Sequence, residues 1–163
     1  MMKKFFMFVA FAAMCITASA QDLKTYDGPH SISQYPADFE PVVFSWSDED
    51  GVVIWKKDDQ HSLEIIIQED FSTVDDLASN GEYMKGEKEV DINDNPSGWK
   101  TGDVVVKGKT MYFRAVKDGI CCYGFLVNFK DDDCFKGEMI FPEKEETKYK
   151  PMLEKILSTL KKK

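Results

Sequence analysis

GICCYGFLVNFKDDDCFKGEMIF, residues 119–141, contains two apolar segments joined by an acidic turn. In the first, ICCYGFLVNF (120–129), both alternating faces are apolar, which is typical of a central strand that is covered on both sides. The second, CFKGEMIF (134–141), has one apolar face and is ended by Pro142. Two such strands joined by a short turn form an antiparallel hairpin. The stretch therefore predicts the centre of an antiparallel sheet.

The alternation also predicts a register for this hairpin, because opposed residues of an antiparallel pair share a face. Placing the apolar faces together pairs Phe129 with Phe135 and Tyr123 with Phe141, around a turn made by residues 131–133. A slip by one residue would place apolar side chains against polar ones and is therefore disfavoured.

The same register limits what the three cysteines of the hairpin can do. It places Cys134 near the turn and both Cys121 and Cys122 at the far end, about 25 Å away, whereas a disulfide needs Cα atoms within about 7 Å. Their spacing matches neither a zinc site nor a C-x-x-C redox motif. We expect Cys121 and Cys122 to pack on opposite faces of a buried strand. Cys134 is expected to be more exposed, and a bond from it to a second chain remains an alternative.

Further strand signals lie on both sides of the hairpin. Four precede the midpoint of the chain: SISQY (31–35), VVFSW (42–46), VVIWKK (52–57) and HSLEIIIQE (61–69). A fifth, VVVKGKTMYFRAVK (104–117), is one strand or two, because Gly108 interrupts it. Asp50-Gly51 and Asp118-Gly119 are turn signals that suit hairpins.

Two segments change to helical spacing. Residues 73–85 carry apolar side chains at helical intervals, and Ser72 has capping-box spacing to an acid three residues later. The C-terminal segment 148–163 has a stripe of five apolar residues, with Thr147 as the expected cap. The order strands, helix, strands, helix predicts an α+β domain with a largely antiparallel sheet.

The N-terminal segment MMKKFFMFVAFAAMCITASA (1–20) predicts export. It combines two early lysines, an apolar run too short to span a bilayer and a small-residue cleavage motif. We expect cleavage after Ala20 and a single domain over residues 21–163. Lipidation at Cys15 is the alternative, and it is disfavoured because Met14 stands where a small residue is required.

The charge of the chain restricts its partners. Lysine and arginine total 21 against 29 aspartates and glutamates, and loss of the leader's two lysines moves the net charge from −8 to −10. So acidic a surface disfavours nucleic acid and anionic membranes. We expect no membrane span after leader cleavage and a monomer in the periplasm or outside the cell.

One loop partly resembles a calcium site. Asp91, Asn93 and Asn95 match the first three oxygen ligands of a calcium-binding loop. The pattern then fails, because Pro96 replaces the required glycine and Gly102 stands where the bidentate glutamate belongs. A solvated loop is the favoured interpretation, and weak cation binding is the alternative.

No catalytic constellation is readable. His30 and His61 are each followed by serine, but no serine lies in a nucleophile motif such as G-x-S-x-G. The acidic groups at 48–50 and 131–133 are expected to be charged turns. We therefore assign no catalytic, cofactor-binding or metal-binding residue and expect no cofactor. A small hydrolase that uses acidic residues without a motif remains the alternative function.

Trp99 is the best candidate for an aromatic side chain that contacts a partner. It lies in the loop 91–103, which is rich in glycine and aspartate, and binding residues are concentrated on loops. The alternative is an anchor that packs onto the sheet. Together with the 131–133 turn, this loop is the predicted contact surface.

The segment HSISQYPADFE (30–40) resembles the opening of PsbP-like domains, which begin with a short strand ending in Tyr-Pro followed by an aromatic residue. Here these are Tyr35, Pro36 and Phe39, and the closing helix PMLEKILSTLKK (151–162) is similar to the last helix of that group. The resemblance implies an α/β/α sandwich, in which two helices cover a largely antiparallel sheet. It also implies a binding or assembly module rather than an enzyme, and it transfers no functional residue. Together with the predicted export, this indicates a module that binds a protein or other partner in the envelope or extracellular space.

Overall fold

The computed structural model describes residues 22–42, 51–68, 76–130 and 133–163. The predicted leader, the cap at Ser72, the acidic group 48–50 and most of the 131–133 turn lie outside these residues, as does nearly all of the predicted strand 42–46.

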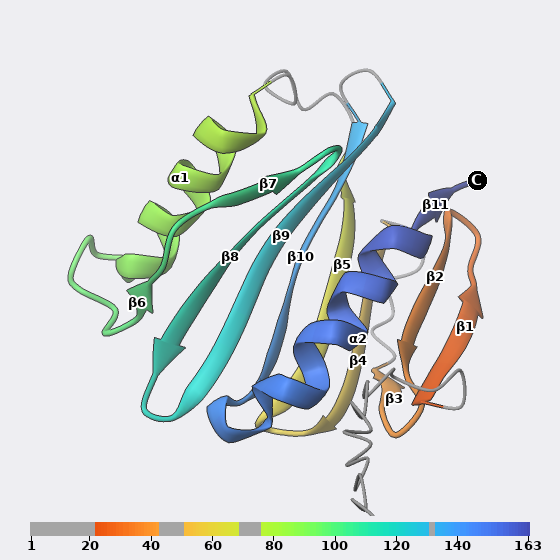
Figure 1. Cartoon of the computed structure of the whole chain (residues 1–163), viewed down its shortest axis with the longest axis horizontal. Helices are drawn as coiled ribbons and strands as arrows, with labels where there is room; N and C mark the ends of the chain where they lie inside the picture. The colour runs from red at the N-terminus through yellow and green to blue at the C-terminus, as the bar shows by residue number, and fades with distance from the viewer. Residues whose placement is uncertain (1–21, 43–50, 69–75, 131–132) are drawn as a thin grey trace, which may run out of the picture.

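The described strands form two antiparallel sheets (Figure 1). The larger sheet has the order β3-β4-β5-β10-β9-β8-β6, with β7 paired to β8, and the smaller has the order β1-β2-β11. The strands are β1 (Leu23–Asp27), β2 (Ser31–Pro36), β3 (Glu40–Val42), β4 (Val52–Asp58), β5 (His61–Gln68), β6 (Lys100–Thr101), β7 (Val105–Lys107), β8 (Thr110–Lys117), β9 (Ile120–Lys130), β10 (Asp133–Pro142) and β11 (Lys161–Lys162).

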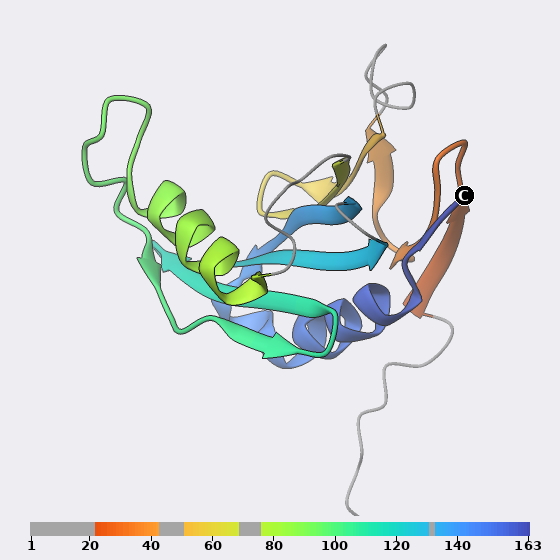
Figure 2. The same cartoon turned by 90° about the horizontal axis from the view of Figure 1, so that it is seen from above.

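Two helices cover opposite faces of the larger sheet (Figure 2). Helix α1 (Leu77–Glu89) packs on one face, over β8 and β9. Helix α2 (Glu146–Thr159), preceded by the 3₁₀ turn η2 (Glu143–Glu145), packs on the other face beside the small sheet. This arrangement confirms the predicted α+β class and the α/β/α sandwich.

The larger core lies on the α2 face. The predicted apolar stripe of α2 is confirmed. Its fifth residue, Leu160, is half-buried, and the other four are buried in this core: Met152, Leu153, Ile156 and Leu157. The residues that carry the PsbP-like resemblance lie in the same core. Phe39 is fully buried, and Tyr35 stacks on Trp55 with ring centroids 5.0 Å apart, which joins the small sheet to β4.

The register of the β9–β10 hairpin differs from the predicted one by two residues. Phe135 lies opposite Val127 and Phe141 opposite Cys121, with an irregularity between Asp133 and Cys134. Each side chain keeps its predicted face, because a shift by two preserves the alternation. The apolar pattern therefore could not distinguish the two registers, and the strands extend further towards the turn than we expected.

The three cysteines of the hairpin are free and buried. Cys121 belongs to the α2-side core and Cys122 to the α1-side core, which confirms their packing role. The expectation for Cys134 was wrong: it is fully buried in the same cluster as Cys122 and Leu126. Burial raises the pKa of Cys121 and of Cys134 to about 11, so both thiols are protonated near neutral pH.

Both helices begin at other residues than predicted. Helix α1 runs from Leu77 to Glu89 instead of 73–85, and the carboxylate of Asp76 caps it by accepting a hydrogen bond from the backbone N–H of Ser79 at 3.0 Å. Helix α2 follows directly on η2, so Thr147 lies inside its first turn and is not the cap.

The C-terminal end of α2 also differs from expectation, and a proline lies within the helix. Pro151 lies inside α2, beyond its first turn, on the exposed side of the helix. Lys161 and Lys162 do not extend the helix but pair with β2 as β11. The segment 104–117 is divided into two strands, β7 and β8, at the predicted glycine.

Gly81 shows why a glycine is needed inside α1. A Cβ atom there would lie 2.6 Å from Val104 Cγ1 and 3.0 Å from the sulfur of Met111, whereas one at Gly86, in the same helix, would meet nothing within 4 Å. We expect Gly81→Ala to lower the free energy of unfolding by about 1 to 3 kcal/mol because it overpacks the α1 interface. Gly86→Ala should raise it by about 0.5 to 1 kcal/mol through helix propensity.

Urea denaturation of the two variants and the parent chain measures both effects. Equal stabilisation by the two substitutions would show that α1 is not packed this closely on β8.

Candidate functional site

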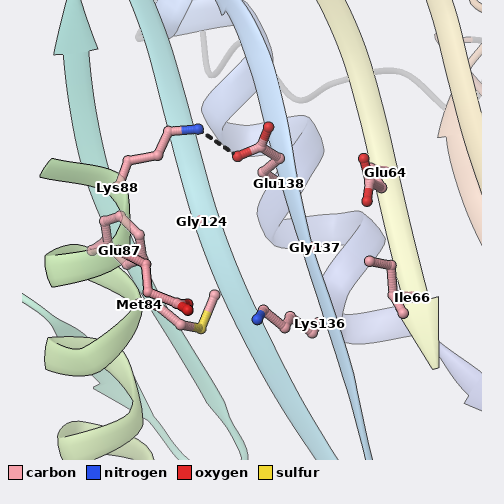
Figure 3. Close-up of a pocket in the computed structure, with 10 residues that line it drawn as sticks. Glu64, Ile66, Met84, Glu87, Lys88, Gly124, Lys136, Gly137 and Glu138 are labelled. Atoms are coloured by element: carbon pink, nitrogen blue, oxygen red, sulfur yellow. Dashed lines mark hydrogen bonds and ion pairs between the residues drawn. The ribbon is translucent and has the colours of Figure 1, made fainter. Parts of the chain in front are cut away.

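A pocket of about 230 Å³ lies between α1 and the open part of the sheet (Figure 3). We call it the helix–sheet groove. It exists because α1 lies over β8 and β9 and leaves the same face of β10 and β5 less covered. Its lining residues are Glu64 and Ile66 of β5, Met84, Glu87 and Lys88 of α1, Phe113 of β8, Gly124 of β9, and Lys136, Gly137 and Glu138 of β10.

The floor of the groove is shaped by a glycine. A Cβ atom at Gly124 would lie 2.5 Å from the ring of Phe113. The ring can therefore lie over β9 at this position only because residue 124 is a glycine. The sulfur of Met84 and the side chain of Ile66 border the groove on its two sides. The groove therefore combines apolar walls with charged groups.

Glu138 is the carboxylate that the fold neutralises. Its Oε2 atom lies 2.6 Å from Lys88 Nζ and accepts a hydrogen bond from the Cys122 thiol at 3.4 Å. Burial disfavours the charge of Lys88, but the nearby Cys122 and Glu138 outweigh this effect and raise its pKa. This pair joins α1 to β10 across the groove.

Glu64 is the carboxylate that the fold does not neutralise. It lies directly opposite Glu138 in the β5–β10 ladder, and like charges in that position repel. Burial raises its pKa, Glu138 raises it further, and Lys88 and Lys136 act in the opposite direction. In the described part of the chain we find no hydrogen bond or ion pair to its carboxylate, and Figure 3 shows it beside the space of the groove.

The histidine at the start of β5 belongs to a structural cluster. His61 Nδ1 lies 2.7 Å from Asp58 Oδ1, and Nε2 lies 3.2 Å from Glu145 Oε2. The ring packs against Tyr149 and Phe39. Within the described residues, the hydrogen-bond partners of this ring are Asp58 and Glu145, and no serine hydroxyl contacts it.

A second cluster fixes the start of α2 to β8. Arg114 binds Glu146 with two hydrogen bonds of 2.9 Å and Glu143 with one of 2.7 Å. Tyr123 donates a hydrogen bond to the same Glu146 carboxylate. The hydrogen bonds from Arg114 lower the pKa of Glu146 more than any other interaction. All these groups are engaged with one another, which indicates a structural clamp.

The calcium-like segment is a turn that its own aspartate holds together. The Asp91 carboxylate accepts hydrogen bonds from the backbone N–H groups of Asn93 at 2.8 Å and Asn95 at 3.1 Å. The N–H of Asp91 donates to the carbonyl of Asn95 at 2.7 Å, and Val90 pairs with Pro96. Across the described ranges, no three acidic, histidine or cysteine residues are placed to hold a metal ion.

This turn presents Ile92 at its tip with a side chain that is 100% exposed. Trp99, the predicted contact residue, is instead half-buried against the α1-side core, with Lys88 Nζ 4.6 Å from its ring centroid. The anchor alternative for Trp99 is therefore the correct one. Of the predicted contact surface, residues 91–96 of the turn are exposed, whereas Asp131 and Asp132 lie outside the described residues.

None of the helices within the described ranges is long and apolar enough to cross a membrane.

Comparisons with known proteins show the fold. No protein-family profile and no curated protein matches the chain. The solution structure of cyanobacterial PsbP (CyanoP) from Synechocystis sp. PCC 6803 matches with a TM-score of 0.61 and 14% identity, over 93% of this chain and 99% of that one.

Two structures of Mog1 match as well. The Ran-binding protein Mog1p of Saccharomyces cerevisiae gives a TM-score of 0.58 at 9% identity, over 85% of this chain and 94% of that one. A Mog1 point mutant gives 0.57 at 10% identity, over 85% and 95%. The chain therefore has a PsbP-like fold, and identities this low establish the fold alone.

The opposed carboxylates generate a test of stability. Because the pKa of Glu64 is raised in the folded chain, its ionised form destabilises the fold, and this cost disappears as the pH falls below the pKa of the unfolded chain. We expect Glu64→Gln to raise the free energy of unfolding by about 0.5 kcal/mol at pH 7 and to have little effect near pH 3.

Urea titrations at the two pH values give this difference directly. The control is Glu154→Gln, which makes the same charge change on the opposite side of the sheet. A Glu64→Gln variant that is less stable than the parent chain at pH 7 would contradict the electrostatic account.

Proposed function

We propose that this chain is an exported, non-catalytic binding or assembly module that acts in the cell envelope or outside the cell, and that its partner is a protein. Ile92 supports this proposal more than any other observation, because an acidic surface here presents a completely exposed aliphatic side chain. Interface anchors are buried apolar or aromatic side chains at the centre of a contact.

The turn that carries Ile92 is suited to this role. Asp91 uses its carboxylate and its N–H to fix the backbone on both sides of the tip, and Ser97 Oγ donates to the carbonyl of Lys88 at 2.5 Å. A contact residue on a fixed turn loses little conformational entropy when it binds. The segment is therefore preorganised for a contact with another protein.

Two further observations support the proposal. The side chains of His61 and Arg114 are both engaged by acidic residues, and their contacts with Glu143, Glu145 and Glu146 join η2 and the start of α2 to the sheet. Mog1p, which has the same fold, is described as Ran-binding, so the fold serves protein recognition in that case. This second point is an analogy of fold, and the proposal of export rests on the sequence of residues 1–20 alone.

Capture of the partner tests the proposal. Tagged protein comprising residues 21–163 is crosslinked in cell envelope and culture medium, and enriched proteins are identified by mass spectrometry. We expect one enriched partner, whose recovery falls by about tenfold or more with Ile92→Asp, since an anchor contributes at least about 2 kcal/mol. Val106→Asp changes a half-exposed apolar side chain elsewhere and should leave recovery unchanged.

Loss of the partner with both variants, or no enrichment above background, would contradict the proposed contact. Unchanged urea midpoints for the two variants exclude unfolding as the cause of any loss.

Export is tested by the mass and N-terminal sequence of the protein recovered after expression of the full chain. Cleavage after Ala20 predicts a product that begins at Gln21 and is absent from the cytoplasm. A protein that keeps its first twenty residues in the cytoplasm would overturn this part of the proposal.

A further inference from the structure

We propose that the helix–sheet groove binds one lysine or arginine side chain of a partner polypeptide. The cationic group would bind the carboxylate of Glu64, and the aliphatic stem would lie between Met84 and Ile66. The inference rests on the proposed function, because it takes the occupant from a protein partner, and it adds the chemistry by which that partner is recognised.

The first argument is an uncompensated charge. Glu64 and Glu138 are opposed in adjacent strands, and Lys88 forms its ion pair with Glu138. Like charges directly opposite one another destabilise a sheet, and such departures from favourable local pairing are expected at functional sites. A cation bound to Glu64 would remove the repulsion that remains in the free protein.

Lys88 and Lys136 lower the pKa of Glu64, but among the described residues neither forms an ion pair with its carboxylate. Lys136 lies opposite Ile66, one diagonal step from Glu64, and among the described residues we find no ion pair between Lys136 and a carboxylate. The wall of α1 adds a third carboxylate, Glu87, so the groove is lined by three glutamates and two lysines. Its charge is therefore complementary to one added positive group.

The second argument is shape. A volume of about 230 Å³ is below the range of about 300 to 1,000 Å³ that is usual for sites of drug-sized ligands, and it suits a single long side chain. Lysine and arginine place their methylene stems on apolar surface and keep the charge at a polar group. Met84 is an adaptable wall for such a stem, and Phe113 offers its ring above Gly124.

The third argument distinguishes a side chain from a free amino acid or a metal ion. A free amino acid would bring its own carboxylate beside Glu64 and Glu87, whereas a residue within a chain brings neutral amide groups. A metal ion would need several oxygen ligands, and Glu138 is already engaged by Lys88 and the Cys122 thiol.

A titration followed by NMR tests the groove without a known partner. The ¹⁵N-labelled chain of residues 21–163 is titrated with Nα-acetyl-lysine methylamide and Nα-acetyl-arginine methylamide. The matched neutral probes are the norleucine and citrulline analogues. We expect a Kd of about 1 mM for the cationic probes, with shifts at the amides of 64–66, 84–88 and 136–138, and binding at least about tenfold weaker for the neutral ones.

The variants are those of the stability test. Glu64→Gln should abolish the shifts although it does not destabilise the chain, and Glu154→Gln should retain them. Equal affinity for charged and neutral probes, shifts spread over other acidic surfaces, or unchanged binding by Glu64→Gln would each overturn the inference. Tighter binding of putrescine than of the capped lysine would assign the groove to a small amine and overturn the polypeptide occupant.

The two proposals can fail separately. A partner that is captured through Ile92 and unaffected by Glu64→Gln would refute the groove alone. Binding of the capped lysine without any captured partner would refute the proposed function and the polypeptide occupant, although the groove would still bind cations.

Discussion

The burial of β9 on both faces is the constraint on which the rest of the structure depends. Its residues alternate between two separate cores, with Cys121 and Phe125 on one side and Cys122 and Leu126 on the other. A strand of this kind is stable only if each face is covered, and one layer of helices cannot cover both. The α2 helix and the small sheet cover one face, α1 covers the other, and the three-layer architecture follows from this requirement.

The two faces of the larger sheet are covered to different extents, and the helix–sheet groove lies on the less covered face. The α2 face holds most of the buried aromatic residues, whereas α1 is a single helix of 13 residues over part of a broad sheet. The remainder of that face carries the charged residues of β5 and β10. The Lys88–Glu138 pair joins the helix to the sheet at one edge, and Glu64, opposite Glu138, takes no part in the ion pair. The groove thus results from the partial cover that α1 gives this face and from the β5–β10 register, which places Glu64 opposite Glu138.

Much of the fold could be predicted because it depends on local patterns. The central hairpin, the division at Gly108 and the stripe of α2 follow from alternation and helical spacing. The two-residue register shift could not be predicted, because alternation is the same in both registers. The burial of Cys134, the opposition of Glu64 to Glu138 and the exposure of Ile92 depend on contacts between distant segments, and no local pattern encodes them. The strands β1, β6 and β11 were missed for the same reason.

The small sheet connects the two extremes of the described chain. Its strands β1 and β11 both pair with β2, so a sheet near the start of the domain is completed by residues 161 and 162. Closing it brings together segments separated by nearly the whole described chain, and pairing over such a sequence separation favours slow folding. A chain delivered from its N-terminus therefore cannot complete this layer until its last residues have emerged. Until then, the edge of β2 that pairs with β11 lacks its partner strand.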